Sequence, residues 1–236
     1  MQKKYIGGLV FLVVVVALVV SVGLTIHAVT NANTNGHSTG GQQVGQRRYS
    51  VVENVFPVDP CTDPTFIKAH PDIAHQDTAC QNSSNQTWVN YSLTDIVVGA
   101  NSLVTVTIVN YTRPNGLINT FWQQPQGVVG DAISVNGKQE KSVSPSMISH
   151  TFAIHGIASS SQPWLFVSVP VTEADLSAGF DAHGIALKPT VTIFQFHTLG
   201  KGHYIWFCQA PCGTQTTHTG GPMSTKGYMS GTFTVV

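Results

Sequence analysis

The segment from Cys208 to Met229 gathers side chains that bind soft metals. Cys208 and Cys212 are followed by His218 and by two methionines, Met223 and Met229, in a stretch otherwise made of Gly, Thr, Ser and strand-forming residues. Thiolate and thioether ligands select copper, zinc or iron–sulfur clusters, and a set of His, Cys and a weak Met suits electron-transferring copper. The same spacing also fits a loop closed by a Cys208–Cys212 disulfide. The segment therefore predicts either a metal site or a stapled loop.

A further candidate ligand, His150, lies far upstream in the motif SHTFAIHG, on an expected strand. Cys208 ends another expected strand, HYIWF, and opens a loop that closes on the last expected strand, GTFTVV. One ligand from an upstream strand thus joins a cluster from the loop between the final two strands. His155, His197 and His203 lie near these segments, and we interpret them as surface or supporting groups.

The elements that must position these ligands are β-strands. Residues 103–109 form a β-branched run, LVTVTIV, which is entered through Gly-Ala-Asn and is typical of a strand. Residues 171–181 predict one or two helical turns with Thr172 as the N-cap. Many short strands separated by Gly and Pro predict an all-β sandwich or barrel. The other expected strands cover residues 149–154, 164–169, 190–196, 203–207 and 231–236.

These motifs resemble the cupredoxin superfamily, and most closely the copper domain of cytochrome c oxidase subunit II in its single-anchor form. Such domains carry a His-x-Phe strand, then Cys-x-x-x-Cys-Gly, and then Met-x-Gly-Thr before a β-branched final strand. The resemblance covers about residues 93–236 and implies an all-β, cupredoxin-like Greek-key β-sandwich. In this chain the three motifs read His150-Thr-Phe, Cys208-Gln-Ala-Pro-Cys-Gly and Met229-Ser-Gly-Thr.

The resemblance implies copper as the cofactor, with a dinuclear centre preferred and a mononuclear blue-copper site as the alternative. Lys226 stands where the dinuclear family has a histidine, so His218 fills that role only if its longer loop folds back. Met229 is preferred to Met223 as the axial ligand because it is followed by x-Gly and the last strand. The implied ligand set is His150, Cys208, Cys212, His218 and Met229.

The N-terminus predicts a single membrane-spanning helix. After MQKK, an uncharged run from Tyr5 to about Thr30 is long enough, at roughly 1.5 Å per residue, to cross a hydrocarbon core of about 30 Å. A cleaved signal peptide is the alternative, but its apolar region would cover only about 7–15 residues. Lys3 and Lys4 precede the run, so the positive-inside rule places the N-terminus in the cytoplasm and the remainder outside the cell membrane.

The expected organisation has three parts. Residues 1–30 form the anchor, residues 31–48 form a flexible linker rich in Gly, Asn, Ser and Thr, and residues 49–236 form the extracytoplasmic cupredoxin-like domain. The core of that domain is expected at about 88–236, because the stretch before it is loop-rich with few strand signals. Cys61 and Cys80 lie in this stretch and, in an oxidising compartment, are expected to form a disulfide.

Charge is scarce, with 11 Lys and Arg against 11 Asp and Glu, so no basic patch exists to neutralise the phosphates of a nucleic acid. The chain has no Gly-x-Ser-x-Gly elbow, His-Glu-x-x-His pair or glycine-rich phosphate loop, and it is not expected to be catalytic alone. Its four Asn-x-Ser/Thr sequons, which include Asn110, carry little weight in so Asn- and Thr-rich a sequence.

We therefore expect a membrane-anchored copper protein that transfers electrons, as the electron-entry subunit of a cytochrome c oxidase-type complex. Its redox partner would be a soluble electron donor, an oxidase subunit I-like membrane protein, or both. Two alternatives remain at this point, a mononuclear blue-copper carrier and a copper-binding or structural module without electron transfer.

Overall fold

The computed structural model describes residues 46–57, 68, 88–114, 119–157, 165–182, 184–210, 222 and 227–236. No helix in these ranges is long and apolar enough to cross a membrane. The predicted anchor, the linker up to residue 45 and the predicted Cys61–Cys80 disulfide lie outside the described residues.

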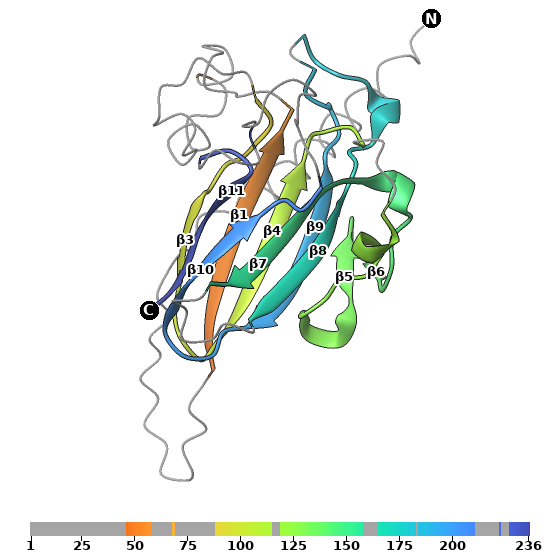
Figure 1. The fold of residues 1–236 in the computed structure, drawn as a ribbon. Coiled ribbons are helices and arrows are strands. Elements are labelled where there is room, and N and C mark those ends of the chain that lie inside the picture. Colours follow the sequence, from red (N-terminus) through yellow and green to blue (C-terminus); the bar gives the residue numbers. More distant parts are fainter. Residues whose placement is uncertain are drawn as a thin grey trace, which may run out of the picture. The chain divides into compact units, whose positions relative to one another are not determined.

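The first sheet has six strands and is built around β4 (Figure 1). Residues of β4 alternate between buried and half-buried positions along its whole length, as the β-branched pattern predicts. β4 pairs in parallel with β1 and antiparallel with β9. In spatial order the strands are β2 (Asn90–Tyr91), β1 (Arg47–Phe56), β4 (Ser102–Asn110), β9 (Thr190–His197), β5 (Ile133–Val135) and β6 (Lys138–Glu140).

The second sheet has five strands and holds both motif-bearing segments. β10 lies between β11 and β7, antiparallel to both, while β3 joins the edge of the sheet by parallel pairing with β11. In spatial order the strands are β3 (Asp95–Val98), β11 (Ser230–Val235), β10 (Gly202–Phe207), β7 (Ile148–Gly156) and β8 (Phe166–Thr172).

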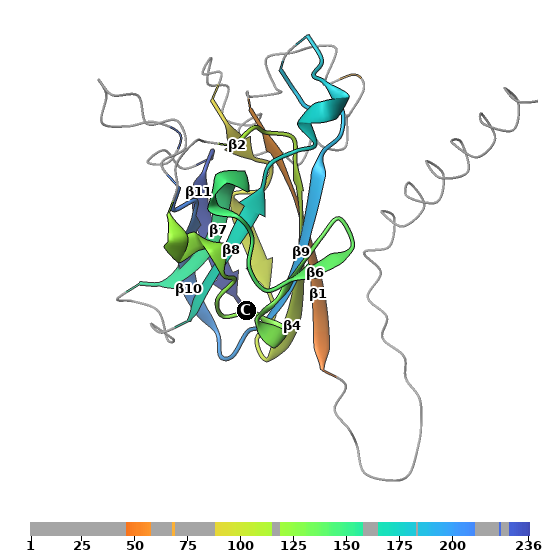
Figure 2. The ribbon, with the colours of Figure 1, turned by 90° about the vertical axis from the view of Figure 1, so that its right-hand side faces the viewer.

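The two sheets pack face to face as a β-sandwich, and Figure 2 shows them as two layers. Their inner side chains form one apolar core, in which Val106 of the first sheet is buried together with Phe152 and Trp206 of the second. The rings of Phe152 and Trp206 stack at 5.3 Å, and Phe194 of β9 meets Phe152 at 5.8 Å. The all-β prediction is confirmed.

Strand β1 was not expected, because its sequence falls in the stretch interpreted as loop-rich and its first two residues fall in the expected linker. The inner face of β1 carries Val51, Glu53 and Val55, and the carboxylate interrupts the apolar alternation that identifies a strand. Glu53 is buried, and its Oε2 accepts a hydrogen bond from the Leu93 backbone N–H at 2.9 Å. A buried but hydrogen-bonded carboxylate therefore concealed the longest strand of the first sheet.

The predicted helical turn is displaced from Thr172. Thr172 is the last residue of β8, and the short 3-10 helix η5 (Leu176–Ala178) begins later, where the Asp175 carboxylate accepts from the Ser177 backbone N–H. The N-cap is therefore Asp175. The other short 3-10 helices described are η2 (Thr120–Gln123), η3 (Val129–Asp131) and η4 (Pro145–Met147).

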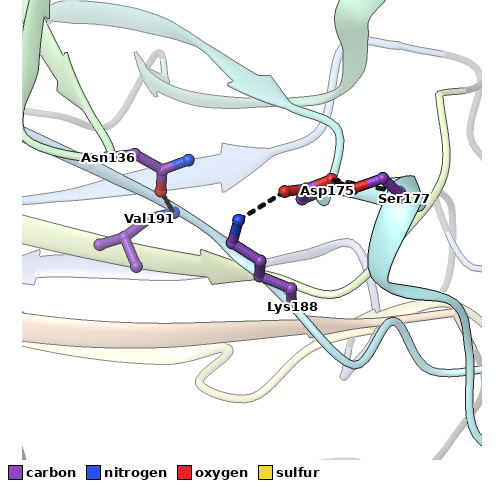
Figure 3. Close-up of polar contacts among 5 residues, drawn as sticks. All are labelled: Asn136, Asp175, Ser177, Lys188 and Val191. Carbon is purple, nitrogen blue, oxygen red and sulfur yellow. Dashed lines mark hydrogen bonds and ion pairs between the residues drawn. The ribbon is translucent and has the colours of Figure 1, made fainter. Parts of the chain in front are cut away.

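The turn between β5 and β6 is Asn136-Gly137, with φ angles of 49° and 85°. Two successive positive φ values suit a two-residue hairpin whose twist matches its strands, and Asn-Gly is the favoured pair for it. Asn136 also accepts a hydrogen bond through Oδ1 from the Val191 backbone N–H at 2.9 Å (Figure 3). The hairpin tip is thus fixed to the start of β9.

Candidate metal centre

Three of the five predicted ligands lie where strands of the second sheet begin or end. His150 lies near the start of β7, Cys208 directly follows β10, and Met229 directly precedes β11. All three are buried, with exposed fractions of 4%, 0% and 0%. The Cys208 backbone N–H donates to the Met229 carbonyl oxygen at 2.9 Å, which ties the two ends of the intervening loop together. We call this region, where β7 begins and β10 ends, the site end.

The strand that carries His150 also contacts the Cys208 sulfur. The backbone N–H of Thr151 donates to Cys208 Sγ at 3.4 Å, and the Thr151 hydroxyl oxygen accepts from the Gln209 N–H at 2.6 Å. The sulfur in turn lies 3.4 Å from the Ala210 carbonyl oxygen, to which a thiol donates. The sulfur thus has a backbone donor and a backbone acceptor at the same distance, and these contacts hold it beside β7.

The imidazole of His150 is anchored by polar residues at the end of β4, in the opposite sheet, and just beyond it. Its Nε2 lies 2.8 Å from the hydroxyl of Thr112, which lies two residues beyond the end of β4. The same hydroxyl donates to Asn110 Oδ1 at 2.8 Å. The ring of Tyr91 meets the imidazole edge to face, with 6.4 Å between centroids. Three described residues thus restrict the orientation of this ring.

The strand pairing next to His150 is irregular. Ile148 pairs with Thr172 and His150 pairs with Val171, so β7 has one extra residue, Ser149, opposite β8. Such a bulge re-aims the side chains beside it and is common next to functional sites. It leaves His150 on the inner face with Phe152, at the end of the core.

Large aromatic side chains close the region beneath the site end. Trp206, Tyr91 and Phe152 are fully buried and in contact, with Tyr91 and Trp206 edge to face at 5.1 Å. Their polar atoms are used, because Tyr91 Oη donates to the Thr151 carbonyl and Trp206 Nε1 donates to the Thr94 carbonyl, each at 3.1 Å. These rings exclude water and hold the surrounding backbone rigidly.

The other histidines noted in the sequence lie further out. His155 stacks on Phe207 at 5.1 Å and its Nε2 lies 3.3 Å from Gln209 Nε2, while partial burial lowers its pKa. His197 Nδ1 lies 2.8 Å from Gln46 Nε2, and His203 Nδ1 lies 3.4 Å from the Thr234 hydroxyl. None of these contacts involves His150, Cys208 or Met229.

The remaining predicted ligands, Cys212 and His218, and the alternative Met223 lie outside the described residues. Within the described ranges no three His, Cys, Asp or Glu side chains come together as a metal site. The described candidates are therefore the imidazole of His150, the cysteine sulfur of Cys208 and the thioether of Met229. Methionine is not one of the four residue types just named.

The polar residues that support these ligands were not predicted from the sequence. Asn110 and Thr112 had the spacing of a glycosylation sequon, but Asn110 is fully buried and its side-chain amide donates to the Thr172 carbonyl at 2.7 Å. Thr151 and Gln209 were adjacent to predicted ligands without being singled out. Only this adjacency could have indicated them, because their contacts join residues about sixty positions apart in the chain.

Comparison with known proteins finds no matching family model and no matching curated protein. Among solved structures, the copper protein rusticyanin is 14% identical over 80% of this chain and 78% of its own, with a TM-score of 0.35. A rusticyanin from Thiobacillus ferrooxidans has the same identity and coverage and a TM-score of 0.31. Auracyanin B is 13% identical over 80% of this chain and 88% of its own, with a TM-score of 0.31.

A multicopper oxidase is 8% identical, with a TM-score of 0.29, and this chain covers 44% of its length. At such identities and TM-scores the likenesses do not by themselves assign a function. The assignment rests on the contacts within this chain.

Proposed function

We propose that this chain is a cupredoxin-like copper protein that transfers single electrons. The observation that carries the proposal is the hydrogen bond from Thr151 N–H to the buried Cys208 sulfur, which places the neighbour of His150 against the cysteine. The backbone hydrogen bond between Cys208 and Met229 holds Met229, the third candidate ligand, at the same end of the sandwich. A set of His, Cys and weak Met serves both Cu(I) and Cu(II).

The chemistry of the donor set fits copper. His150 offers an imidazole nitrogen, Cys208 a buried sulfur that accepts from a backbone N–H, and Met229 a thioether. Copper, when bound, supplies a one-electron couple. The protein supplies a rigid, water-excluding surround through Trp206 and Tyr91, which keeps the ligands in one arrangement in both oxidation states.

The finer assignment is a subunit II-like redox module with a dinuclear centre, in which Cys212 and His218 complete the ligand set. The Cys208-x-x-x-Cys212-Gly spacing supports two copper ions, which Cys208 and Cys212 would both hold, whereas Lys226 at the family's histidine position favours a single blue copper. We propose the dinuclear form. The apolar run at residues 5–30 supports a single-pass cell-membrane anchor with the copper domain outside.

The proposed partners are a soluble electron donor and an oxidase subunit I-like membrane protein. Contacts between redox partners are small and transient, and the low charge of this chain leaves apolar and uncharged polar groups to form them.

The test is copper stoichiometry and electron paramagnetic resonance on the reconstituted full-length chain. We expect two copper ions per chain and a hyperfine pattern spread over two nuclei, which Cys212→Ser collapses. Cys208→Ser is expected to abolish coloured copper binding, and Cys61→Ser serves as the matched cysteine control that leaves the spectrum unchanged. One copper with a spectrum insensitive to Cys212→Ser would replace the dinuclear assignment with a blue site. Unchanged binding in Cys208→Ser would refute the copper site itself.

A further inference from the structure

The contacts around Asn110 determine which nitrogen of His150 carries the proton. The Thr172 carbonyl can only accept a hydrogen bond, so the amide atom that faces it at 2.7 Å is Nδ2. The Thr112 backbone N–H can only donate, so the atom that faces it at 3.1 Å is Oδ1. The two contacts independently give the same orientation of the Asn110 amide.

This orientation fixes the direction of the next hydrogen bond. Asn110 Oδ1 has no hydrogen, and the Thr112 hydroxyl lies 2.8 Å from it. The hydroxyl has a single proton, which it must donate to Oδ1. Its oxygen is left as an acceptor toward His150 Nε2, also at 2.8 Å.

We propose that Asn110 and Thr112 are positioning residues that hold the neutral His150 ring as the Nε2–H tautomer and thereby present Nδ1 to the metal. A neutral imidazole carries one N–H, so donation from Nε2 to Thr112 leaves the lone pair on Nδ1. The proposal deepens the proposed function, on which its metal-binding part rests. The part that concerns the tautomer depends only on the hydrogen bonds just described.

The surroundings hold this relay in place. Asn110, Thr112 and His150 are each at most 4% exposed, so water does not compete for their hydrogen bonds. The Thr112 carbonyl accepts from the Ala174 N–H at 3.0 Å, which fixes the backbone beside the hydroxyl. Asn110 ends β4 in the first sheet, whereas Thr172 and His150 belong to β8 and β7 in the second. The relay therefore links the two layers at the site end.

The direct test is nitrogen-15 nuclear magnetic resonance of the histidine rings in the metal-free full-length chain. The ten histidines are distinguished by His150→Gln, which removes one set of signals. We expect His150 to show the Nε2–H pattern. An Nδ1–H pattern in the wild type would overturn the proposal, and this measurement needs no variant other than the one used for assignment.

Variants at Thr112 separate positioning from packing. Thr112→Val removes the hydroxyl at nearly constant volume, and we expect both tautomers of His150 to appear. Thr112→Ser keeps the hydroxyl and should restore the Nε2–H form. Thr192→Val is the matched control, because Thr192 is also fully buried and its hydroxyl has no hydrogen-bond partner among the residues that the structure describes. An unchanged tautomer in Thr112→Val would contradict the proposal.

Copper binding supplies the second measurement, by competition between the chain and a chelator for Cu(II). Residues that orient a metal-bound histidine typically change metal affinity by about 10–100-fold, and we expect a loss of about 10-fold in Thr112→Val, with Thr112→Ser and Thr192→Val close to the wild type. Equal affinity in Thr112→Val and Thr192→Val would contradict the positioning role. A wild type that binds no copper but shows the Nε2–H pattern would instead overturn the proposed function and leave the tautomer assignment standing.

Discussion

Two polar clusters of this protein use similar contacts in opposite environments. At the site end, Asn110, Thr112 and His150 form a relay of two side-chain hydrogen bonds, each 2.8 Å long, inside the sandwich. On the surface, Lys188 Nζ donates to Asp175 Oδ2 at 2.6 Å beside η5 (Figure 3). The surface contact is the shorter one and joins full charges.

Judged by length and charge alone, the surface contact would contribute more to stability than the buried relay, but burial reverses this order. The side chains of Lys188 and Asp175 are 65% and 32% exposed, so water and salt screen their attraction and replace it when it breaks. The polar atoms of the relay are buried and cannot form replacement hydrogen bonds with water. Each buried group that loses its partner therefore costs about 1–3 kcal/mol. The environment of a hydrogen bond, more than its length, therefore decides how much the fold depends on it.

Gly231→Ala, at the site end, is expected to have the largest effect. β11 approaches β3 so closely there that a Cβ atom on residue 231 would lie 1.7 Å from the Thr94 carbonyl oxygen. Backbone cannot move aside without separating the two strands, so we expect a loss of more than about 3 kcal/mol in the free energy of unfolding, or failure to fold. Urea denaturation measures it, and a loss below about 1 kcal/mol would show that the sheet edge is more compliant than the sandwich requires.

Asn110→Ala tests the buried half of the comparison. It removes a hydrogen bond from the Thr172 carbonyl and another from the Thr112 N–H, and we expect the free energy of unfolding to fall by about 3 kcal/mol. Asn136→Gly is the exposed control, because it removes a similar amide-to-backbone bond while tolerating the positive φ angle of that residue. We expect it to cost less than about 1 kcal/mol. Equal losses in the two variants would contradict the claim that the buried hydrogen bonds contribute more to stability than the exposed one.

Gly137→Ala separates crowding from backbone conformation. A Cβ at this position would meet nothing within 4 Å, unlike one at Gly231, but the φ angle of 85° disfavours any side chain. We expect a cost of about 1 kcal/mol by urea denaturation, from the strain of this conformation alone. A cost as large as that of Gly231→Ala would mean that the hairpin tip holds the sheet more firmly than its exposed position indicates.

The sequence predicted those parts of the fold in which local pattern and tertiary packing agree. β4 shows the expected alternation because its inner residues are apolar without exception from Val104 to Ile108. β1 was missed because Glu53 occupies an inner position, and nothing local shows that Leu93 N–H will satisfy it. Thr172 was misassigned as a helix cap because its packing in β8 prevailed over its local preference.

The candidate site likewise contains residues that local sequence predicts and residues that only tertiary packing brings together. Cys208 and Met229 could be placed at strand ends from the expected strands beside them and from the family motifs, and the strand of His150 was recognisable from its motif. The contact between Thr112 and His150 joins residues 38 positions apart, one just beyond a strand of the first sheet and one in a strand of the second, so it depends on the packing of the sandwich and has no local pattern. Supporting residues of this kind require a three-dimensional structure.

The smallest effect is expected at the exposed cluster, where Asp175→Asn tests its pH dependence. Hydrogen bonds from Lys188, and then from Ser177, lower the pKa of Asp175 from 3.8 to about 2. A carboxylate whose pKa is lower in the folded state stabilises the fold fully above its unfolded pKa and loses this contribution as the pH falls through its folded pKa. The contribution of Asp175 should therefore be constant above about pH 4 and decline between about pH 4 and pH 2.

Asn is a good N-cap and can still accept from the Ser177 N–H, so Asp175→Asn removes the charge while η5 keeps its cap. The melting temperature of the wild type should exceed that of the variant slightly above pH 4, and the difference should shrink toward pH 2. In a Lys188→Met background, the difference in melting temperature between Asp and Asn at position 175 should be smaller. Because both side chains of the pair are exposed, added salt should also reduce this difference. A difference in melting temperature that does not change with pH or salt would show that Asp175 acts only as a cap. A loss of unfolding free energy as large as that of Asn110→Ala would refute the ranking of buried over exposed contacts.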